Sequence, residues 1–325
     1  MQHRQLQNDW IAVRFSLVEV HRLKSKTTQS QHLRVFEKLR EFCGRPSDVD
    51  EETIVRLVEW ASSDGRSPAT VNQILRYARA QCRKLVRKGL LSVSPFDLEP
   101  FFVRERRNPL GKHHPQEEIA KVLALADQEA DLGGMDPAEV PRRRSRLWKA
   151  NRLRALLYFD VFTGARRDEA LWLRWEDLDL ENCFAEITGA EHRLKTFGSE
   201  ALLPLAQRAR DALIAWRQVC GDGKYVFPCV RKDRPWTGGN CKDRPLGQLK
   251  ALGVRAGVKG LTFLSLRHSL ATAMEDWGFS ELQIQRILRH TNPLTQKHYR
   301  QRDRENLRRM AERFAFFDEE RRKAA

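Results

Sequence analysis

The feature that most constrains the fold is the recurrence of apolar residues at steps of three and four along the first third of the chain. Spacing of this kind places apolar side chains on one face of an α-helix, and several such helices bury those faces against one another. The pattern therefore predicts a small helical bundle. Its apolar positions are Leu6, Trp10, Val13, Leu17 and Val20, then Leu33, Phe36, Leu39 and Phe42, then Ile54, Leu57, Val58 and Ala61, and finally Ile74, Leu75, Ala78, Cys82 and Leu85.

Local signals predict where these helices begin and end. The polar run of residues 27–30 is expected to precede the second helix, and the acidic residues just before Ile54 favour the N-terminus of the third. In the fourth helix Ser67 can act as the cap and Pro68 can occupy the first turn. Gly89 is expected to end that helix.

Charge favours a nucleic-acid partner. The chain has 59 Lys and Arg against 43 Asp and Glu, a formal net charge of +16. Such an excess gives affinity for phosphate without any sequence preference, and a merely basic protein is an alternative on charge alone. The fourth helix is especially basic, and we predict that it contacts DNA, although a solvated surface is about as plausible for any single residue. Its cations are Arg76, Arg79, Arg83, Lys84, Arg87 and Lys88.

Residues 99–114 are predicted to form a basic interdomain linker. Arg104, Arg106 and Arg107 stand there beside a proline, a glycine and two histidines, and they could follow a DNA backbone. A helix is expected from Pro115, and a loop over residues 131–146. Two strands, at 183–188 and 200–205, are expected to flank a turn around Lys195. The chain is therefore predicted to be mainly α with a small β-sheet.

Four residues whose types suit attack on a phosphodiester occur in the second half. Arg166 lies in the run TGARRDEAL, and Arg267, His290 and Tyr299 lie in LSLRHSLATAMEDWGFSELQIQRILRHTNPLTQKHYR. Paired arginines can clamp two phosphate oxygens and meet the charge that grows on them in the transition state. A tyrosine hydroxyl can attack phosphorus and form a covalent intermediate.

This ordered set resembles the tyrosine recombinases of the phage integrase family over nearly the whole chain. The family's T-G-x-R-x-x-E run matches residues 163–169, so the resemblance makes Arg166 the first catalytic arginine and Glu169 its supporting carboxylate. A Lys-Thr pair before a strand ending in Pro-Leu matches Lys195-Thr196 and Pro204-Leu205. Lys195 is thereby expected to be the general acid for the leaving 5′ oxygen.

The later motifs of the family also match, with two departures. The box H-x-L-R-H reads Leu264 to His268 here, so Arg267 takes the second arginine's role and His268 a supporting one, but the first histidine is a leucine. The L-G-H motif reads Leu288, Arg289 and His290, and Tyr299 follows nine residues later as the expected nucleophile.

The resemblance implies an architecture and an activity. Residues 1–98 are expected to form a helical, SAM-like core-binding domain that grips DNA, and residues 115–325 an α+β catalytic domain with a C-terminal interaction helix. The implied enzyme cuts and rejoins double-stranded DNA at specific recombination sites through a 3′-phosphotyrosine intermediate and a Holliday junction. It is expected to be a monomer or weak oligomer when free and a homo-tetramer on synapsed DNA, with room for an accessory directionality factor.

Two other function classes stay open. A DNA-binding relative with impaired catalysis would keep the fold and the basic surface, and Leu264 favours it because leucine can neither bind the phosphate nor accept a proton. A type IB topoisomerase would use similar chemistry as a monomer on DNA of any sequence. Covalent trapping that depends on DNA sequence would separate all three.

The C-terminal segment is predicted to be an amphipathic helix, with Leu307, Met310, Phe314 and Phe317 at helical spacing. Docking into a neighbouring protomer and packing against its own domain are about equally plausible.

No metal or other cofactor is expected. The six cysteines include no C-x-x-C pair and are expected to be thiols, and no acidic cluster indicates magnesium. The chain has no secretory signal and no apolar stretch long enough to cross a membrane, so a cytoplasmic, nucleoid-associated protein without membrane contact is predicted.

Overall fold

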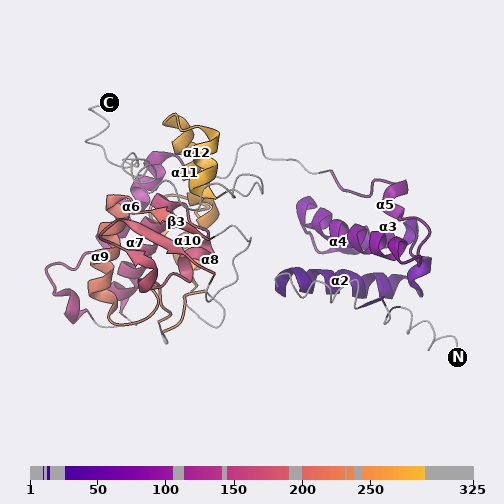
Figure 1. The fold of residues 1–325 in the computed structure, drawn as a ribbon, viewed down its shortest axis with the longest axis horizontal. Helices are drawn as coiled ribbons and strands as arrows, with labels where there is room; N and C mark the ends of the chain where they lie inside the picture. The colour runs from indigo at the N-terminus through magenta and orange to yellow at the C-terminus, as the bar shows by residue number, and fades with distance from the viewer. Residues whose placement is uncertain are drawn as a thin grey trace. The chain divides into compact units, whose positions relative to one another are not determined.

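The chain divides into two compact units, Met1–Asn108 and Pro109–Ala325 (Figure 1). The structure, a computed structural model, describes residues 10, 13–14, 26–104, 113–140, 145–189, 200–230, 233–237 and 244–289. The boundary between the units lies inside the segment predicted to be the linker. Each unit has its own hydrophobic core, as expected when two separate sets of apolar faces must be buried.

The first unit is a bundle of helices, α2 (Lys26–Phe42), α3 (Glu51–Ser63), α4 (Pro68–Arg87) and the short α5 (Pro95–Leu98). The predicted apolar positions form its core: Phe36, Leu39, Ile54 and Leu75 are fully buried or nearly so. Most of the first predicted helix lies outside the described residues, but Trp10 is helical and packs edge-on against Phe36, with ring centroids 5.4 Å apart.

The predicted helix ends are confirmed with one exception. Asp50 accepts a hydrogen bond from the backbone N–H of Thr53 at 2.8 Å, and Ser67 caps α4. Gly89 has a φ of 68°, the left-handed conformation that often follows a helix end. The exception is the polar run of residues 27–30, which lies inside α2 because that helix already begins at Lys26.

Both described ends of the predicted linker are fastened by hydrogen bonds. The side chain of Asn72 on α4 donates to the carbonyl of Val103 at 2.7 Å and accepts from its N–H at 2.8 Å. In the second unit the backbone N–H of His114 donates to Ser269 Oγ at 2.7 Å. The linker therefore leaves the first unit beside α4, and it reaches the second unit beside the helix that contains Ser269.

The second unit is mainly helical with a small sheet (Figure 1), which confirms the predicted fold class. Its helices are α6 (Gln116–Ala130), α7 (Arg146–Thr163), α8 (Arg167–Leu171), α9 (Gln207–Cys220), α10 (Pro245–Arg255), α11 (Phe263–Asp276) and α12 (Glu281–Leu288). Strands β1 (Leu178–Asp179), β2 (Phe184–Ile187) and β3 (Ala201–Pro204) form an antiparallel sheet in that order. The strands near 183–188 and 200–205 were predicted; the two-residue β1 was not, because it is too short to show alternation.

Helix α7 is the centre of this unit and is buried on nearly every side. It ends at Gly164, whose φ of 58° is left-handed. A β-carbon at Gly164 would lie 2.5 Å from Leu288 Cδ2 and 3.0 Å from Leu270 Cδ2. A glycine is therefore required where α7, α11 and α12 meet, and this junction places the TGARRDEAL segment beside the two later helices.

One cysteine differs from the expectation. Cys229 is disulfide-bonded instead of being a thiol, whereas Cys43, Cys82, Cys183 and Cys220 are free. Nothing in the sequence indicated this bond, because its cysteines include no C-x-x-C pair.

Candidate active site

Arg166 is fixed by the turn that starts α8. Its backbone N–H donates to Glu169 Oε2 at 2.8 Å, and its guanidinium donates to Glu169 Oε1 at 2.7 Å and to the carbonyl of Arg289 at 2.9 Å. The side chain of Glu169 is 4% exposed and that of Arg166 is 23% exposed. Arg166 is thus held from behind by a buried carboxylate and still reaches the surface.

Arg267 on α11 reaches the same place from a distant part of the sequence. Its guanidinium donates to the carbonyl of Gly164, at the end of α7, and to the carbonyl of Leu288, at the end of α12. The residue is only 6% exposed. The two arginines that the sequence predicted to act together are therefore brought to one junction, where the carbonyl groups of consecutive residues, Leu288 and Arg289, each bind one of them.

A third arginine, Arg289, completes what we call the arginine cluster: Arg166, Arg267 and Arg289 around Glu169. The Arg289 guanidinium donates to Glu169 Oε2 at 2.6 Å, and its side chain is 5% exposed. In the sequence, Arg289 stands out only as a departure from the glycine of the L-G-H motif. Nothing in the local sequence indicated that its side chain turns inward, because Glu169 lies 120 residues earlier.

The arginine cluster shifts the pKa values of the ionisable groups within it. Burial raises the pKa of Glu169, but Arg289 and Arg166 outweigh this and the net pKa lies below its ordinary value, so the carboxylate is ionised. Burial, together with the charges of Arg289 and Arg166, lowers the pKa of Arg267 from 12.5 to about 9. Three guanidiniums thus share one carboxylate, and a site with excess positive charge is suited to bind a phosphate.

A buried acid, Asp160 on α7, lies behind the cluster. Its two carboxyl oxygens have no hydrogen-bond partner, and it is 2% exposed. Burial, with a smaller contribution from the charge of Glu169, raises the pKa of Asp160 well above its ordinary value. A protonated Asp160 adds no negative charge, so it does not compete with Glu169 for the arginines.

Other predicted site residues are placed differently or lie outside the described residues. Leu264, at the position of the expected histidine, is 62% exposed near the start of α11, and His268 is exposed one helical turn later. Lys195, His290 and Tyr299 lie outside the described residues. The description of α12 ends with Leu288 and its cap Arg289, immediately before His290.

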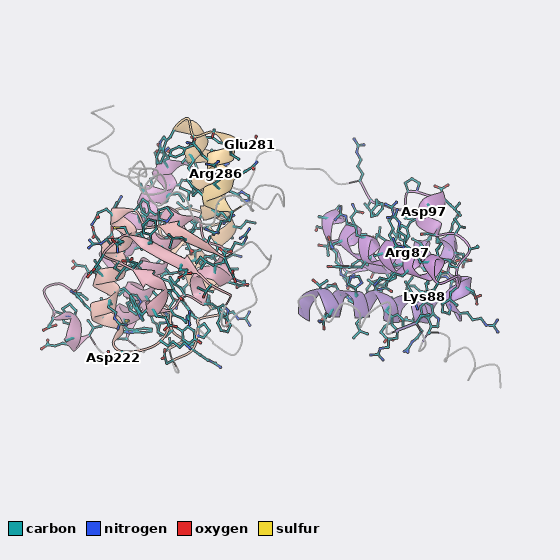
Figure 2. The ribbon with its side chains drawn as sticks, in the orientation of Figure 1. Arg87, Lys88, Asp97, Asp222, Glu281 and Arg286 are labelled. Atoms are coloured by element: carbon teal, nitrogen blue, oxygen red, sulfur yellow. The ribbon has the colours of Figure 1, made fainter. Side chains whose placement is uncertain are left out.

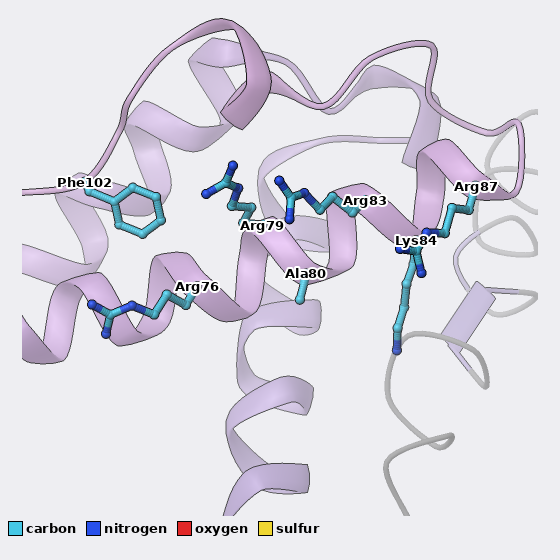
Figure 3. Close-up of a pocket in the computed structure, with 7 residues that line it drawn as sticks. All are labelled: Arg76, Arg79, Ala80, Arg83, Lys84, Arg87 and Phe102. Atoms are coloured by element: carbon cyan, nitrogen blue, oxygen red, sulfur yellow. The ribbon is translucent and has the colours of Figure 1, made fainter. Parts of the chain in front are cut away.

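The first unit has its own cationic surface, which we call the α4 face. Arg76, Arg79, Arg83, Lys84 and Arg87 line one open groove along α4 with Ala80 and Phe102 (Figure 3). From Arg76 to Arg87 the helix rises roughly 16 Å, since each residue adds about 1.5 Å. The groove therefore offers a row of cations rather than an enclosed pocket.

An aspartate moderates the charge of the α4 face. Asp97 Oδ1 lies 3.6 Å from a guanidinium nitrogen of Arg79 and 3.6 Å from one of Arg83. Lys88 follows Arg87 as the exposed C-cap of α4 (Figure 2), and Arg104 is exposed beyond Phe102. Arg106 and Arg107 lie outside the described residues. The sequence did not indicate Asp97, because its relation to α4 depends on how the chain returns through α5.

The described part of the chain contains no group of three or more His, Cys, Asp or Glu residues arranged to hold a metal ion. Among the same residues, no helix has the length and apolar character needed to span a membrane.

Comparisons with known proteins agree on one family. The sequence profile of the Phage integrase family matches residues 145–306. Tyrosine recombinase XerC of Xanthomonas campestris pv. campestris is 30% identical over 265 residues, which cover 80% of this chain and 72% of the relative. Tyrosine recombinase XerD of Caulobacter vibrioides is 24% identical over 303 residues, which cover 89% of this chain and 90% of the relative.

Solved structures share the fold. A lambda integrase dimer bound to a COC′ core site aligns with a TM-score of 0.59 at 17% identity, covering 92% of this chain and 96% of that one. The integrase of transposon Tn1549, in complex with circular intermediate DNA, aligns with a TM-score of 0.62 at 15% identity, covering 88% of this chain and 93% of that one.

Proposed function

The chain belongs to the phage integrase family of tyrosine recombinases, and we propose on this premise that it is a site-specific recombinase that cuts and rejoins double-stranded DNA through a 3′-phosphotyrosine intermediate. The observation that carries the proposal is the junction of α7, α8, α11 and α12, where Arg166 and Arg267 meet although 101 positions separate them in the sequence. Such a pair can bind two non-bridging oxygens of one phosphate.

The proposed reaction assigns one role to each residue. The Tyr299 hydroxyl loses its proton to solvent water as its oxygen attacks phosphorus and forms the P–O bond of the phosphotyrosine, while the bond from phosphorus to the 5′ oxygen breaks. Lys195 gives its proton to that departing oxygen. Arg166 and Arg267 stabilise the charge that develops on the other phosphate oxygens, and His290 adds a hydrogen bond. Rejoining reverses these steps with a 5′-hydroxyl from the partner strand.

We assign DNA-backbone binding to the α4 face. Its side chains lie on the surface, so phosphates can reach them without any change in the fold. B-DNA has one phosphate per about 3.4 Å of axis on each strand, so a row of roughly 16 Å can follow several phosphates. Asp97 weakens the attraction, because it lies 3.6 Å from Arg79 and from Arg83. In this proposal Lys88, Arg104, Arg106 and Arg107 also bind the DNA backbone.

Assembly is proposed from the family. A lambda integrase tetramer bound to a Holliday junction is among the structures that share the fold, with a TM-score of 0.59 at 15% identity. We propose that four copies of this chain act on two DNA sites, with the segment after Tyr299 docking into a neighbour. An accessory factor that sets direction would act on this assembly. The bacterial relatives favour the cytoplasm as the place of action.

A second candidate function is a DNA-binding relative that has lost most of its catalysis. The observation that favours it is Leu264, which lies exposed three residues before Arg267 on α11. A histidine at this position could donate to the phosphate and accept a proton, whereas leucine does neither. Loss of one such group costs roughly 10²-fold to 10⁴-fold in rate, which would slow strand cleavage without changing DNA binding.

The decisive experiment is covalent trapping on the chain's own recombination site. The site would first be selected from random duplexes or from a library of host junctions. Wild type and Tyr299→Phe would then be incubated with nicked suicide substrates that carry it, and adducts separated on denaturing gels. Tyr77→Phe is the matched control, since Tyr77 packs edge-on against His32 in the first unit.

The proposal predicts an adduct with wild type and with Tyr77→Phe but none with Tyr299→Phe. Specific binding without an adduct, even after Leu264→His, would favour the DNA-binding relative instead. An adduct on every duplex regardless of sequence would indicate a topoisomerase.

A further inference from the structure

Arg289 connects the end of α12 to α8 through two hydrogen bonds, one from its side chain and one to its backbone carbonyl. Its side chain donates to Glu169 Oε2 at 2.6 Å, and its carbonyl accepts from the guanidinium of Arg166 at 2.9 Å. Arg166 in turn binds the other oxygen of Glu169 at 2.7 Å. Arg166, Glu169 and Arg289 therefore form a closed ring of hydrogen bonds, and each member holds the other two in place.

This ring is also linked to the second phosphate-binding arginine. Arg267 donates to the carbonyl of Leu288, the residue before Arg289. Any shift of the end of α12 would consequently move the acceptors of both Arg166 and Arg267. The end of α12 is therefore a shared support for the pair of arginines.

The backbone of Arg289 shows that its side chain matters at this position. The residue has φ 54° and ψ 43°, a left-handed conformation that glycine adopts far more easily than arginine. Glycine is also the residue that the family pattern has here. In this chain an arginine, whose nearly buried guanidinium binds a buried carboxylate, stands in its place. Arg289 thus adopts a backbone conformation that is unfavourable for arginine, and the hydrogen bond to Glu169 offsets this cost.

The contact between Arg289 and Glu169 bears on the reaction because Arg289 precedes two of the proposed catalytic residues in the sequence. His290 is the next residue, and Tyr299 follows nine positions later. The groups that the proposed function assigns to nucleophilic attack therefore begin where α12 is fastened to α8. Small displacements of reacting groups are costly, since a shift of about 1 Å can reduce a rate by roughly 10²-fold.

We propose that Arg289 is a positioning residue of this active site: by binding Glu169 it fixes the end of α12, and with it the supports of Arg166 and Arg267 and the start of the segment that leads to Tyr299. The inference rests on the proposed function. It concerns a residue that the family pattern does not use, and it assigns Arg289 no contact with DNA.

Three substitutions distinguish the effect of the Arg289 guanidinium from the effect of its backbone conformation. Arg289→Gly suits the left-handed conformation and removes the side chain, Arg289→Met removes the charge but keeps a long side chain, and Arg289→Lys keeps a charge that can reach Glu169. Arg255→Met is the matched control. Arg255, on α10, also makes a bidentate pair with a glutamate, Glu129 on α6, at 2.8 Å, and neither residue belongs to the arginine cluster. The full chain would be used with the selected DNA site, and affinity and single-turnover adduct formation would be measured separately.

The expected result is a loss of rate without a matching loss of binding. Arg289→Gly and Arg289→Met should form adducts roughly 10-fold to 100-fold more slowly, while their DNA affinity stays within about twofold of wild type. Arg289→Lys should recover part of the rate, and Arg255→Met should match wild type. Wild-type rates in Arg289→Gly, or equal losses in the Lys and Met variants, would overturn the inference.

A second measurement does not depend on activity. Hydrogen exchange of the last turn of α12 should be faster in Arg289→Met than in wild type and should be slowed again in Arg289→Lys, because the contact with Glu169 fastens that turn. Unchanged exchange would reject the positioning role by itself. Absence of an adduct with wild-type protein would instead reject the proposed function, and the exchange data would still decide the role of Arg289.

Discussion

The α4 face and the arginine cluster both collect positive charge, but they hold it in opposite ways. On the α4 face the cations come from one helix and are exposed or half-buried; the Arg83 side chain, for instance, is 52% exposed. In the arginine cluster the cations come from three separate segments, and Arg267 is 6% exposed. The α4 face is a property of one helix, whereas the cluster exists only when α7, α8, α11 and α12 are packed together.

This difference has energetic consequences. Exposed charges are screened by salt and act almost independently, so each contributes little and the contributions add. Buried charges that share Glu169 and backbone carbonyls depend on one another, so removing one disturbs the rest. The α4 face should therefore respond to salt in small steps, and the cluster should respond to single substitutions and to pH in large ones.

The largest expected effect is on the cluster itself. Arg267→Ala should reduce the rate of adduct formation by roughly 10²-fold to 10³-fold, because the transition state loses a preorganised donor. Single-turnover trapping on a suicide substrate would measure it. Arg267→Lys should be nearly as slow, since an ammonium cannot replace the planar fork that binds two carbonyls. Full activity in the lysine variant would show that only charge is needed there.

The junction beneath the cluster gives the next effect. Gly164→Ala should destabilise the second unit by about 2–4 kcal/mol, from the left-handed backbone together with the clash against Leu288 and Leu270. Urea unfolding followed by tryptophan fluorescence would report it. Gly133→Ala is the control, because its φ of 56° is nearly the same but nothing lies within 4 Å of the added carbon. Equal losses in both variants would mean that packing at the junction is loose.

Response to pH should distinguish two buried acids in the second unit. Asp160 has a raised pKa, so the folded state takes up a proton that the unfolded state releases above the ordinary pKa of 3.8. Its contribution to stability is therefore fully present below 3.8 and is lost as the pH rises towards the folded pKa. Asp160→Asn should stabilise the protein at pH 7 by about 1–3 kcal/mol. That gain should vanish at acid pH.

Glu169 should behave in the opposite way. Its pKa is lowered in the folded state, so its contribution to stability is present above its ordinary pKa of 4.5 and is lost as the pH falls through the lower, folded pKa. Glu169→Gln should therefore destabilise the protein at pH 7 and have less effect at acid pH. Thermal unfolding from pH 3 to pH 8 would compare both variants, and the same pH trend in both would contradict the assignment of opposite shifts.

The smallest effects belong to the α4 face. Arg83→Ala should weaken DNA binding only a few-fold and reduce the slope of log affinity against log salt by about 0.9, the value for one phosphate contact. Arg76→Ala should add to it independently, because the two residues lie roughly 10 Å apart along the helix. Fluorescence anisotropy between 50 and 200 mM salt would measure the affinities of both variants and of wild type. Over this salt range the affinity of wild type should fall on the order of 10²-fold. Arg56→Ala, on α3 and paired with Glu52, should leave the slope unchanged.

Prediction from the sequence was strongest where the signal is local. The spacing of apolar residues identified the described helices α2, α3 and α4 of the first unit, and the cap at Ser67 followed from residue type. The spacing around Arg267 and the TGARRDEAL run identified the family before any contact was known. These features depend on neighbours within one or two helical turns, so a one-dimensional pattern contains them.

What the sequence missed depends on contacts between distant segments. Arg289 looked like a mild departure from glycine, yet it is buried on Glu169. Asp160 looked like an ordinary residue of a helix, yet it lies behind the cluster without a hydrogen-bond partner. The disulfide at Cys229 was also missed, because the spacing of the cysteines did not indicate it.

The sequence by itself determined the family, the helical fold of each unit and the identity of the two arginines that meet, because periodicity and motif spacing record local constraints. Only the tertiary structure decided that consecutive carbonyls at the end of α12 hold those arginines and that a third arginine closes the ring through Glu169. The physical reason is that the strength and direction of a charged group depend on burial and on the partners around it. Those partners come from segments up to 123 residues apart, and folding alone brings them together.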